Sequence, residues 1–129
     1  MKKSSVTSIS LLLGLLFVLF SCGSADKAEK TANKFFSLII NGNTAQAVSI
    51  CIDGQIDKAG MTEAIEYFRK NDEAGKLLSA KKGLGFNTSI ENGVTKVALP
   101  YLLKYEKYEK NVEVQLIDQG SGFKIVSVQ

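Results

Sequence analysis

Cysteine and tyrosine have the widest chemical scope in this chain, because its 129 residues include no histidine. The absence of histidine removes the commonest general base and the commonest zinc ligand. It also removes every serine or cysteine catalytic triad that depends on imidazole. Cys51 lies among Val48, Ile50 and Ile52, a setting that favours a buried packing role, with a reactive thiol as the alternative. Cys22 lies in a very different context, at the end of a short apolar run.

Tyrosines supply the other candidate site. Tyr101 and Tyr105 share one face of an expected strand, and Tyr108 follows closely, so the three rings could form an aromatic wall for a ligand. The simpler interpretation is packing at the core and its rim, with the hydroxyls reaching water. The sequence contains no glycine-rich phosphate loop, metal-ligand cluster or nucleotide fingerprint. We therefore assign no catalytic, cofactor-binding or metal-binding residue.

Cys22 ends a segment with the form of a secretory signal peptide: a basic head at Lys2 and Lys3, a short apolar run and a small residue. The run is too short to span a bilayer comfortably, since a spanning helix needs about 20 apolar residues. Its last four residues, Leu19-Phe20-Ser21-Cys22, resemble the lipobox of bacterial lipoproteins. The resemblance implies a diacylglyceryl thioether on Cys22 and cleavage just before it. An uncleaved anchor and an ordinary signal peptide with an incidental cysteine are the alternatives.

This segment sets the expected organisation of the chain. We expect a signal peptide over residues 1–21, a tether over residues 22–26 and one domain with a modest core over residues 27–129. The location would be the bacterial cell envelope, with the membrane reached through the lipid on Cys22. Without Lys2 and Lys3 the chain has 14 basic and 13 acidic residues, so its charge does not favour nucleic acid as a partner.

Three helices are expected after the tether. The first begins at Asp26, which has capping-box spacing with Glu29, and ends at Asn41-Gly42. Its apolar face consists of Ala28, Ala32, Phe35, Phe36 and Ile39. The second begins at Asn43. Its expected stripe is Ala45, Val48, Cys51 and Ile52. The third runs over residues 62–81 with a kink near residue 71, and Ile65, Phe68, Leu77 and Leu78 point inward.

Strand patterns replace helical ones from residue 83. Phe86, Thr88 and Ile90 alternate with polar residues and predict a first strand near residues 85–91. Asn92-Gly93 is the strongest short hairpin signal in the chain, and it joins that strand to a long one over residues 94–105. Pro100 lies inside that strand and indicates an edge position or a bulge. Alternating residues near 112–116 and 123–128 predict two further strands. The predicted fold is α+β, with N-terminal helices packed against a bent four-stranded antiparallel sheet.

These elements carry a family resemblance. Phe35-Phe36, Asn41-Gly42-Asn43 and Ala47 resemble the opening of nuclear transport factor 2-like (cystatin-like) domains. Val112-Glu113-Val114-Gln115-Leu116 and Gly122-Phe123-Lys124-Ile125 resemble their last two strands, with Phe123 where the family usually has tryptophan. The resemblance is closest to small bacterial lipoproteins that carry a domain of unknown function with this cone-shaped fold, and it covers residues 27–128.

Enzymes of that superfamily, such as ketosteroid isomerase and polyketide cyclases, use a carboxylate base in the cone and a tyrosine or second acid as oxyanion donor. Asp53 and Asp57 follow the second expected helix, and Tyr67, Tyr101 and Tyr105 lie elsewhere. None of them matches a family motif residue by residue. Asp53 precedes glycine and is better interpreted as a turn residue.

Three functional hypotheses follow. The first is a lipid-anchored, non-catalytic domain that binds a small apolar ligand or a protein partner, with Phe35, Phe68 and Tyr101 as the expected ligand-binding residues. The second is a cyclase- or isomerase-type enzyme that uses a carboxylate in the cone. The third is a structural domain that associates through its sheet, for example as a homodimer.

Overall fold

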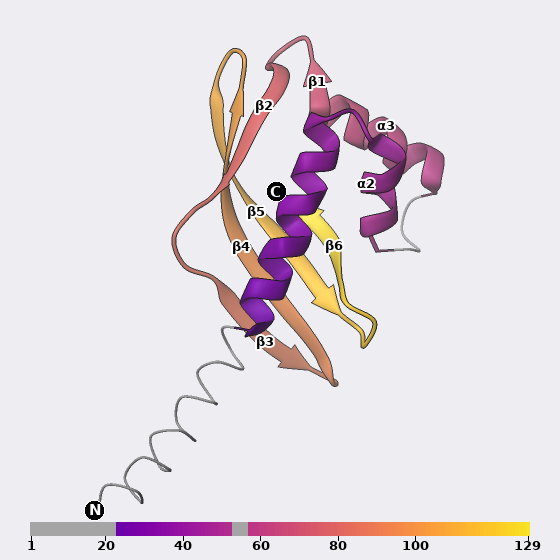
Figure 1. Ribbon diagram of the computed structural model, residues 1–129, viewed down its shortest axis with the longest axis vertical. Coiled ribbons are helices and arrows are strands. Elements are labelled where there is room, and N and C mark those ends of the chain that lie inside the picture. Colours follow the sequence, from indigo (N-terminus) through magenta and orange to yellow (C-terminus); the bar gives the residue numbers. More distant parts are fainter. Residues whose placement is uncertain (1–22, 53–56) are drawn as a thin grey trace, which may run out of the picture.

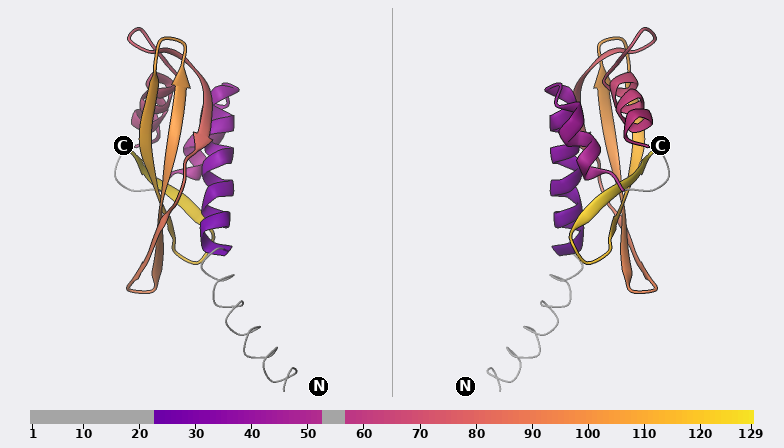
Figure 2. Two further views of the ribbon diagram at one scale, coloured as in Figure 1. Left: turned by 90° about the vertical axis from the view of Figure 1, so that its left-hand side faces the viewer. Right: turned by 90° about the vertical axis from the view of Figure 1, so that its right-hand side faces the viewer.

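The computed structural model describes residues 23–52 and 57–129, so Cys22, the signal segment and Asp53 lie outside the described residues. The described residues form three helices and a curled antiparallel sheet, an α+β arrangement compatible with a cone (Figure 1). The first helix runs along one face of the sheet, and the other two lie on the side of the last strand (Figures 1 and 2). The α+β class is therefore confirmed.

The N-terminal helix covers residues 23–40 and so begins earlier than the expected start at Asp26. All five residues of its expected apolar face are buried. Its end is a Schellman motif: the N–H of Asn43 donates to the carbonyl of Leu38, and Gly42 has a φ of 81°. The expected stop at Asn41-Gly42 is confirmed.

Two short helices follow. Helix α2 spans Thr44–Ile50 and buries Thr44, Ala47 and Val48, whereas Ala45 is exposed, so Ala45 was wrongly placed inward. Helix α3 spans Lys58–Arg69. Asp57 caps it, because its carboxylate Oδ1 accepts the N–H of Gly60 at 2.8 Å.

The expected helix over residues 62–81 is wrong beyond Arg69. Strands β1 (Lys70–Asn71) and β2 (Gly75–Lys82) replace it and pair as a hairpin. Gly75 has a φ of 80°, which a right-handed helix does not allow. Leu77 is fully buried opposite Tyr105 of the sheet, while Leu78 is 48% exposed, so Leu78 was also wrongly placed inward.

The sheet has six strands rather than four. The other four strands are β3 (Asn87–Glu91), β4 (Val94–Tyr105), β5 (Glu109–Asp118) and β6 (Phe123–Val128). The strand order is β1-β2-β4-β5-β6, and β3 pairs with β4 beside β2. The hairpin prediction is confirmed, since Asn92 and Gly93 have φ values of 52° and 77° between β3 and β4.

Strand β4 is a central strand and not an edge strand, but Pro100 lies where one side of β4 is locally unpaired. On one side β4 pairs continuously with β5. On the other side its residues 94–98 pair with β3 and its residues 101–105 pair with β2. Pro100 lies at the gap between those two ladders, where its carbonyl accepts the N–H of Gly83 at 2.8 Å. The N–H that proline lacks would point to the same side, so the missing donor ends the β2 ladder here and leaves the β5 ladder intact.

The core lies between the N-terminal helix and the concave face of the sheet. The inward residues of β5, Val112, Val114 and Leu116, are buried as the alternation predicts. Helix α3 contacts β1 and β2, and α2 contacts β6, where Cys51 forms an isolated bridge with Ile125. The short helices therefore close the side of the curled sheet that the first helix leaves open.

Candidate binding sites

An aromatic cluster fills the interior beneath the N-terminal helix. Phe36 lies at its centre, with ring centroids 5.5 Å from Phe35, 6.1 Å from Phe68 and 4.9 Å from Tyr101. The structure thus brings the three expected ligand-binding residues together around a fourth. Phe36 and Tyr101 are only 2% and 1% exposed, so these rings pack against each other.

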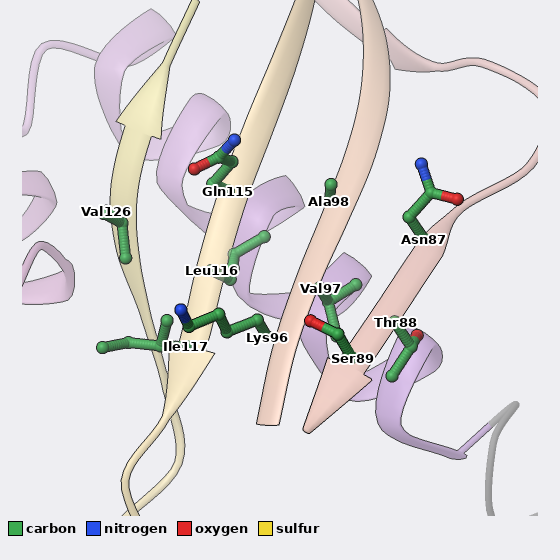
Figure 3. A pocket seen from close by; sticks show the side chains of 10 residues that line it. All are labelled: Asn87, Thr88, Ser89, Lys96, Val97, Ala98, Gln115, Leu116, Ile117 and Val126. Atoms are coloured by element: carbon green, nitrogen blue, oxygen red, sulfur yellow. The ribbon is translucent and has the colours of Figure 1, made fainter. Parts of the chain in front are cut away.

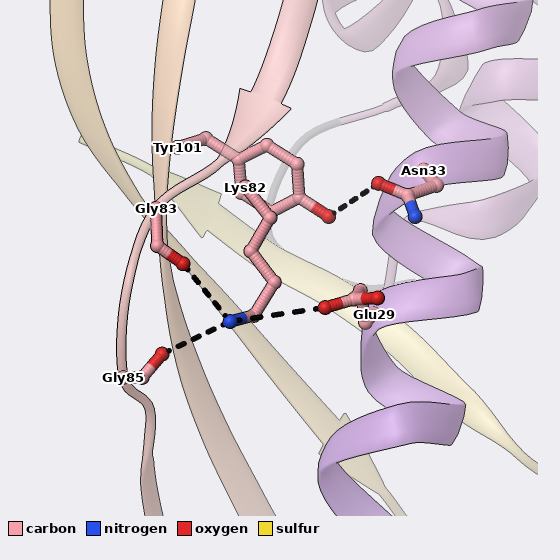
Figure 4. Close-up of polar contacts among 6 residues, drawn as sticks. All are labelled: Glu29, Asn33, Lys82, Gly83, Gly85 and Tyr101. Atoms are coloured by element: carbon pink, nitrogen blue, oxygen red, sulfur yellow. Dashed lines mark hydrogen bonds and ion pairs between the residues drawn. The ribbon is translucent and has the colours of Figure 1, made fainter.

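Both buried tyrosine hydroxyls have protein partners, so the expectation that they reach water is wrong. The Tyr101 hydroxyl donates to Asn33 Oδ1 at 2.7 Å (Figure 4), and that of Tyr105 donates to the carbonyl of Phe68 at 2.8 Å. Burial, aided by the charge of Glu29, raises the pKa of Tyr101 above its ordinary value. Burial, aided by Tyr108, raises the pKa of Tyr105 to about 12. Both groups are thus held as neutral donors.

Sequence reasoning missed Phe36 and Asn33 as site residues. Phe36 belongs to the expected apolar face of the first helix, so its burial was predicted but its central position was not. Asn33 lies three residues before Phe36, one helical turn away, and an amide on the flank of an apolar face is the signal that was available.

An ion pair lies beside this cluster, at the start of the N-terminal helix. Lys82 Nζ is 3.7 Å from Glu29 Oε1 and donates to the carbonyls of Gly83 at 3.0 Å and Gly85 at 3.2 Å (Figure 4). The Lys82 side chain is only 22% exposed. One ammonium group thus links the connection between β2 and β3 to the helix.

A small apolar cavity of about 180 Å³ lies between α3 and β6. Its lining residues are Phe35, Cys51, Ile52, Met61, Ala64, Ile65, Ile125, Val126, Ser127 and Val128. Cys51 is half-buried and free, and burial raises its pKa to about 11 despite the nearby charge of Lys124. The raised pKa disfavours the thiolate, so the packing interpretation of Cys51 fits better than a reactive thiol.

The outer face of the sheet carries a second hollow, of about 270 Å³. Figure 3 shows side chains from β3, β4, β5 and β6 around it, including Ser89, Lys96, Ala98, Gln115 and Val126. A wider groove of about 610 Å³ separates the N-terminal helix from β2 and is lined mostly by polar surface. Of the three hollows, the one beside Cys51 has the most apolar lining.

The remaining candidates are structural or lie outside the described residues. Asp57 is the helix cap of α3, and Tyr67 is 65% exposed. Cys22 and Asp53 belong to the residues that are not described. Within residues 23–52 and 57–129, no three His, Cys, Asp or Glu side chains lie close enough to hold a metal ion. In the same ranges no helix is both long and apolar enough to cross a membrane.

Comparison of the chain with protein-family models, with curated proteins and with solved structures found no match.

Proposed function

We propose that this protein is a lipid-anchored component of the bacterial cell envelope, held through Cys22, with a nuclear transport factor 2-like domain that binds an apolar group without turnover. The anchor rests on the sequence Leu19-Phe20-Ser21-Cys22. The domain assignment rests on the family resemblance together with three helices on a curled antiparallel sheet.

The observation that carries the binding function is the cavity beside Cys51. About 180 Å³ is below the range of sites for drug-sized ligands, roughly 300–1,000 Å³, but comparable to an apolar cavity of about 150 Å³ that binds benzene. The occupant is therefore a group the size of one side chain or ring. An apolar side chain of a protein partner and the end of a small apolar ligand both meet this limit.

The aromatic interior supports binding over catalysis. A cyclase or isomerase of this fold needs a carboxylate and an oxyanion donor aimed at a common point in the cone. Here the Tyr101 hydroxyl donates to the amide oxygen of Asn33, and Phe36 occupies the space beside it. Asp57, one of the two carboxylates considered, is engaged in capping α3.

Methyl NMR of Met61 tests the cavity. Met61 lines it and is the only methionine besides Met1, so a chain processed before Cys22 and labelled at the methionine methyl groups should show a single resonance. Titration with benzene or indole should shift it. Ala64→Leu places a larger side chain on the cavity wall and should suppress the shift, whereas Ala45→Leu, on an exposed site of α2, should not. An unmoved Met61 resonance would exclude the cavity as the binding site.

Intact-mass measurement tests the anchor. Protein extracted from membranes should lack residues 1–21 and carry acyl mass, and Cys22→Ala should abolish that added mass. Recovery of the unmodified full-length chain would refute both the anchor and the envelope location.

Association through the sheet is the second candidate function, and the hollow in the outer face favours it. Ala98, Ile117 and Val126 offer apolar surface there, next to the amide of Gln115 (Figure 3). A homodimer through this face should appear as a doubled mass in analytical ultracentrifugation, and Ala98→Glu should return it to a monomer. A monomeric wild-type protein would exclude this candidate.

A further inference from the structure

Three apolar side chains in β3 and in the connection before it are exposed. Leu84 is 99% exposed, Phe86 43% and Ile90 72%, and we call these three residues the apolar strip. Ile90 pairs with Thr95, and Thr88 between Phe86 and Ile90 pairs with buried Val97. Phe86 and Ile90 therefore point to the face of the sheet that carries the helix, because paired residues share a face and alternate residues return to it.

The apolar strip runs along the side of the domain, from Leu84 near the middle of β4, where Gly83 bonds Pro100, to Ile90 opposite Thr95 at the end where the chain enters. Lys82 joins the connection that contains Leu84 to Glu29 of the N-terminal helix. Glu29 is six residues after Gly23, about 9 Å along the helix axis at the usual rise per residue. Figures 1 and 2 show the start of this helix and the β3–β4 hairpin at the same end of the molecule.

The distance from the proposed lipid to the domain is very short. The helix is already formed at Gly23, the residue that follows Cys22, so no free linker separates the acylated residue from the folded domain. Acyl chains on Cys22 would therefore hold this end of the domain at the membrane surface. Leu84, Phe86 and Ile90 would face the interface there, not bulk water.

We propose that the apolar strip is a second membrane contact, which lies in the lipid interface and fixes the orientation of the anchored domain. The proposal rests on lipidation of Cys22. Leucine, isoleucine and phenylalanine side chains bind interfaces through buried apolar area. Lys27 and Lys30, exposed on the first turns of the helix, add attraction to anionic headgroups. The occupant is thus the surface of a bilayer that contains anionic lipid.

The chain contains no tryptophan, so a single introduced tryptophan is a unique reporter. We would place it at the apolar strip with Leu84→Trp, which an almost fully exposed site should tolerate, and with Phe86→Trp as a second variant. Tyr108→Trp is the matched control. It lies beyond the end of β4 at Tyr105, which is five residues, or about 17 Å along the strand, from Pro100 beside Gly83. Each acylated mature protein, residues 22–129, would be reconstituted in vesicles of anionic and neutral phospholipid, with plain or brominated acyl chains.

The expected result is a blue-shifted emission at position 84 that loses intensity in brominated vesicles, while emission at position 108 changes in neither respect. Vesicle-bound protein without quenching at position 84 would overturn the second contact and leave the anchor intact. Equal quenching at both positions would also overturn it, because the domain would then have no fixed orientation. Protein that lacks acyl mass and does not bind vesicles would overturn the anchor and the contact together.

Discussion

Tyr101→Phe removes one buried hydroxyl and leaves the ring that packs against Phe36. At neutral pH the variant loses the hydrogen bond to Asn33 Oδ1 at 2.7 Å. Asn33 is exposed, so water can replace the lost donor. We therefore expect the free energy of unfolding to fall by about 1 kcal/mol, the usual net value of one hydrogen bond.

Alkaline pH should reverse this difference. Burial raises the pKa of Tyr101 in the folded state above the ordinary value of about 10, so the folded chain keeps a proton that the unfolded chain loses. Stability from this group is complete below pH 10 and decreases above it, by about 1.4 kcal/mol per pH unit. Phenylalanine has no proton to lose. The advantage of the wild-type protein, about 1 kcal/mol, should therefore vanish near pH 11, and the variant should be the more stable protein above it.

Urea unfolding followed by far-ultraviolet circular dichroism, repeated from pH 7 to pH 11.5, measures both curves. Other alkaline effects, such as loss of lysine charge, are common to the two proteins and cancel in the difference. Tyr67→Phe controls for the substitution, since removal of this exposed hydroxyl should change stability at pH 7 by less than about 0.5 kcal/mol. Parallel curves for wild type and Tyr101→Phe would show that the buried hydroxyl does not hold its proton in the folded state, and would refute the reasoning.

Two further predictions concern Cys51 and Gly75. Burial raises the pKa of Cys51 from 9.0 to about 11, so at pH 8 it should react with iodoacetamide about 100-fold more slowly in the folded chain than in urea. The rates would be measured in a Cys22→Ala background, and equal rates would contradict the burial of Cys51. Gly75→Ala should destabilise the fold by more than 1 kcal/mol, because the glycine has a φ of 80° and an added Cβ would lie 2.9 Å from that of Glu106. Gly85→Ala is the control for backbone strain alone, because Gly85 has a φ of 85° and open space around it. If urea unfolding shows the same loss of stability for both variants, the contact with Glu106 has no effect.

The strands after residue 83 could be predicted because their determinants are local. Asn92-Gly93 specifies a tight turn through its positive φ values, and one face of β5 is marked by alternation at Val112 and Val114. The β1–β2 hairpin could not be predicted in the same way. Residues 76–80 are mostly good helix formers, and only pairing of Leu77 with Tyr105, distant in sequence, makes them a strand. Gly75 is the one local sign against a helix in this segment.

The candidate sites also differ in whether local sequence or tertiary contacts determine them. Burial of Phe35 and Tyr101 follows from periodicity, so both could be assigned to the interior. The partner of Tyr101 could not, since Asn33 lies 68 residues away and only the fold brings the two side chains together. The cavity beside Cys51 depends on how α3 packs near β6. The sequence around Met61 does not predict that packing.

Strands β4 and β5 have a consequence for the order in which the protein folds. They pair over ten positions, from Thr95 with Asp118 to Lys104 with Glu109, and only a short turn joins them. Closing so short a loop costs little chain entropy, whereas the contacts of the N-terminal helix with the sheet require much longer loops to close. We therefore expect this hairpin to form first and the N-terminal helix to dock late. The N-terminal helix must therefore wait for strands that lie near the other end of the chain.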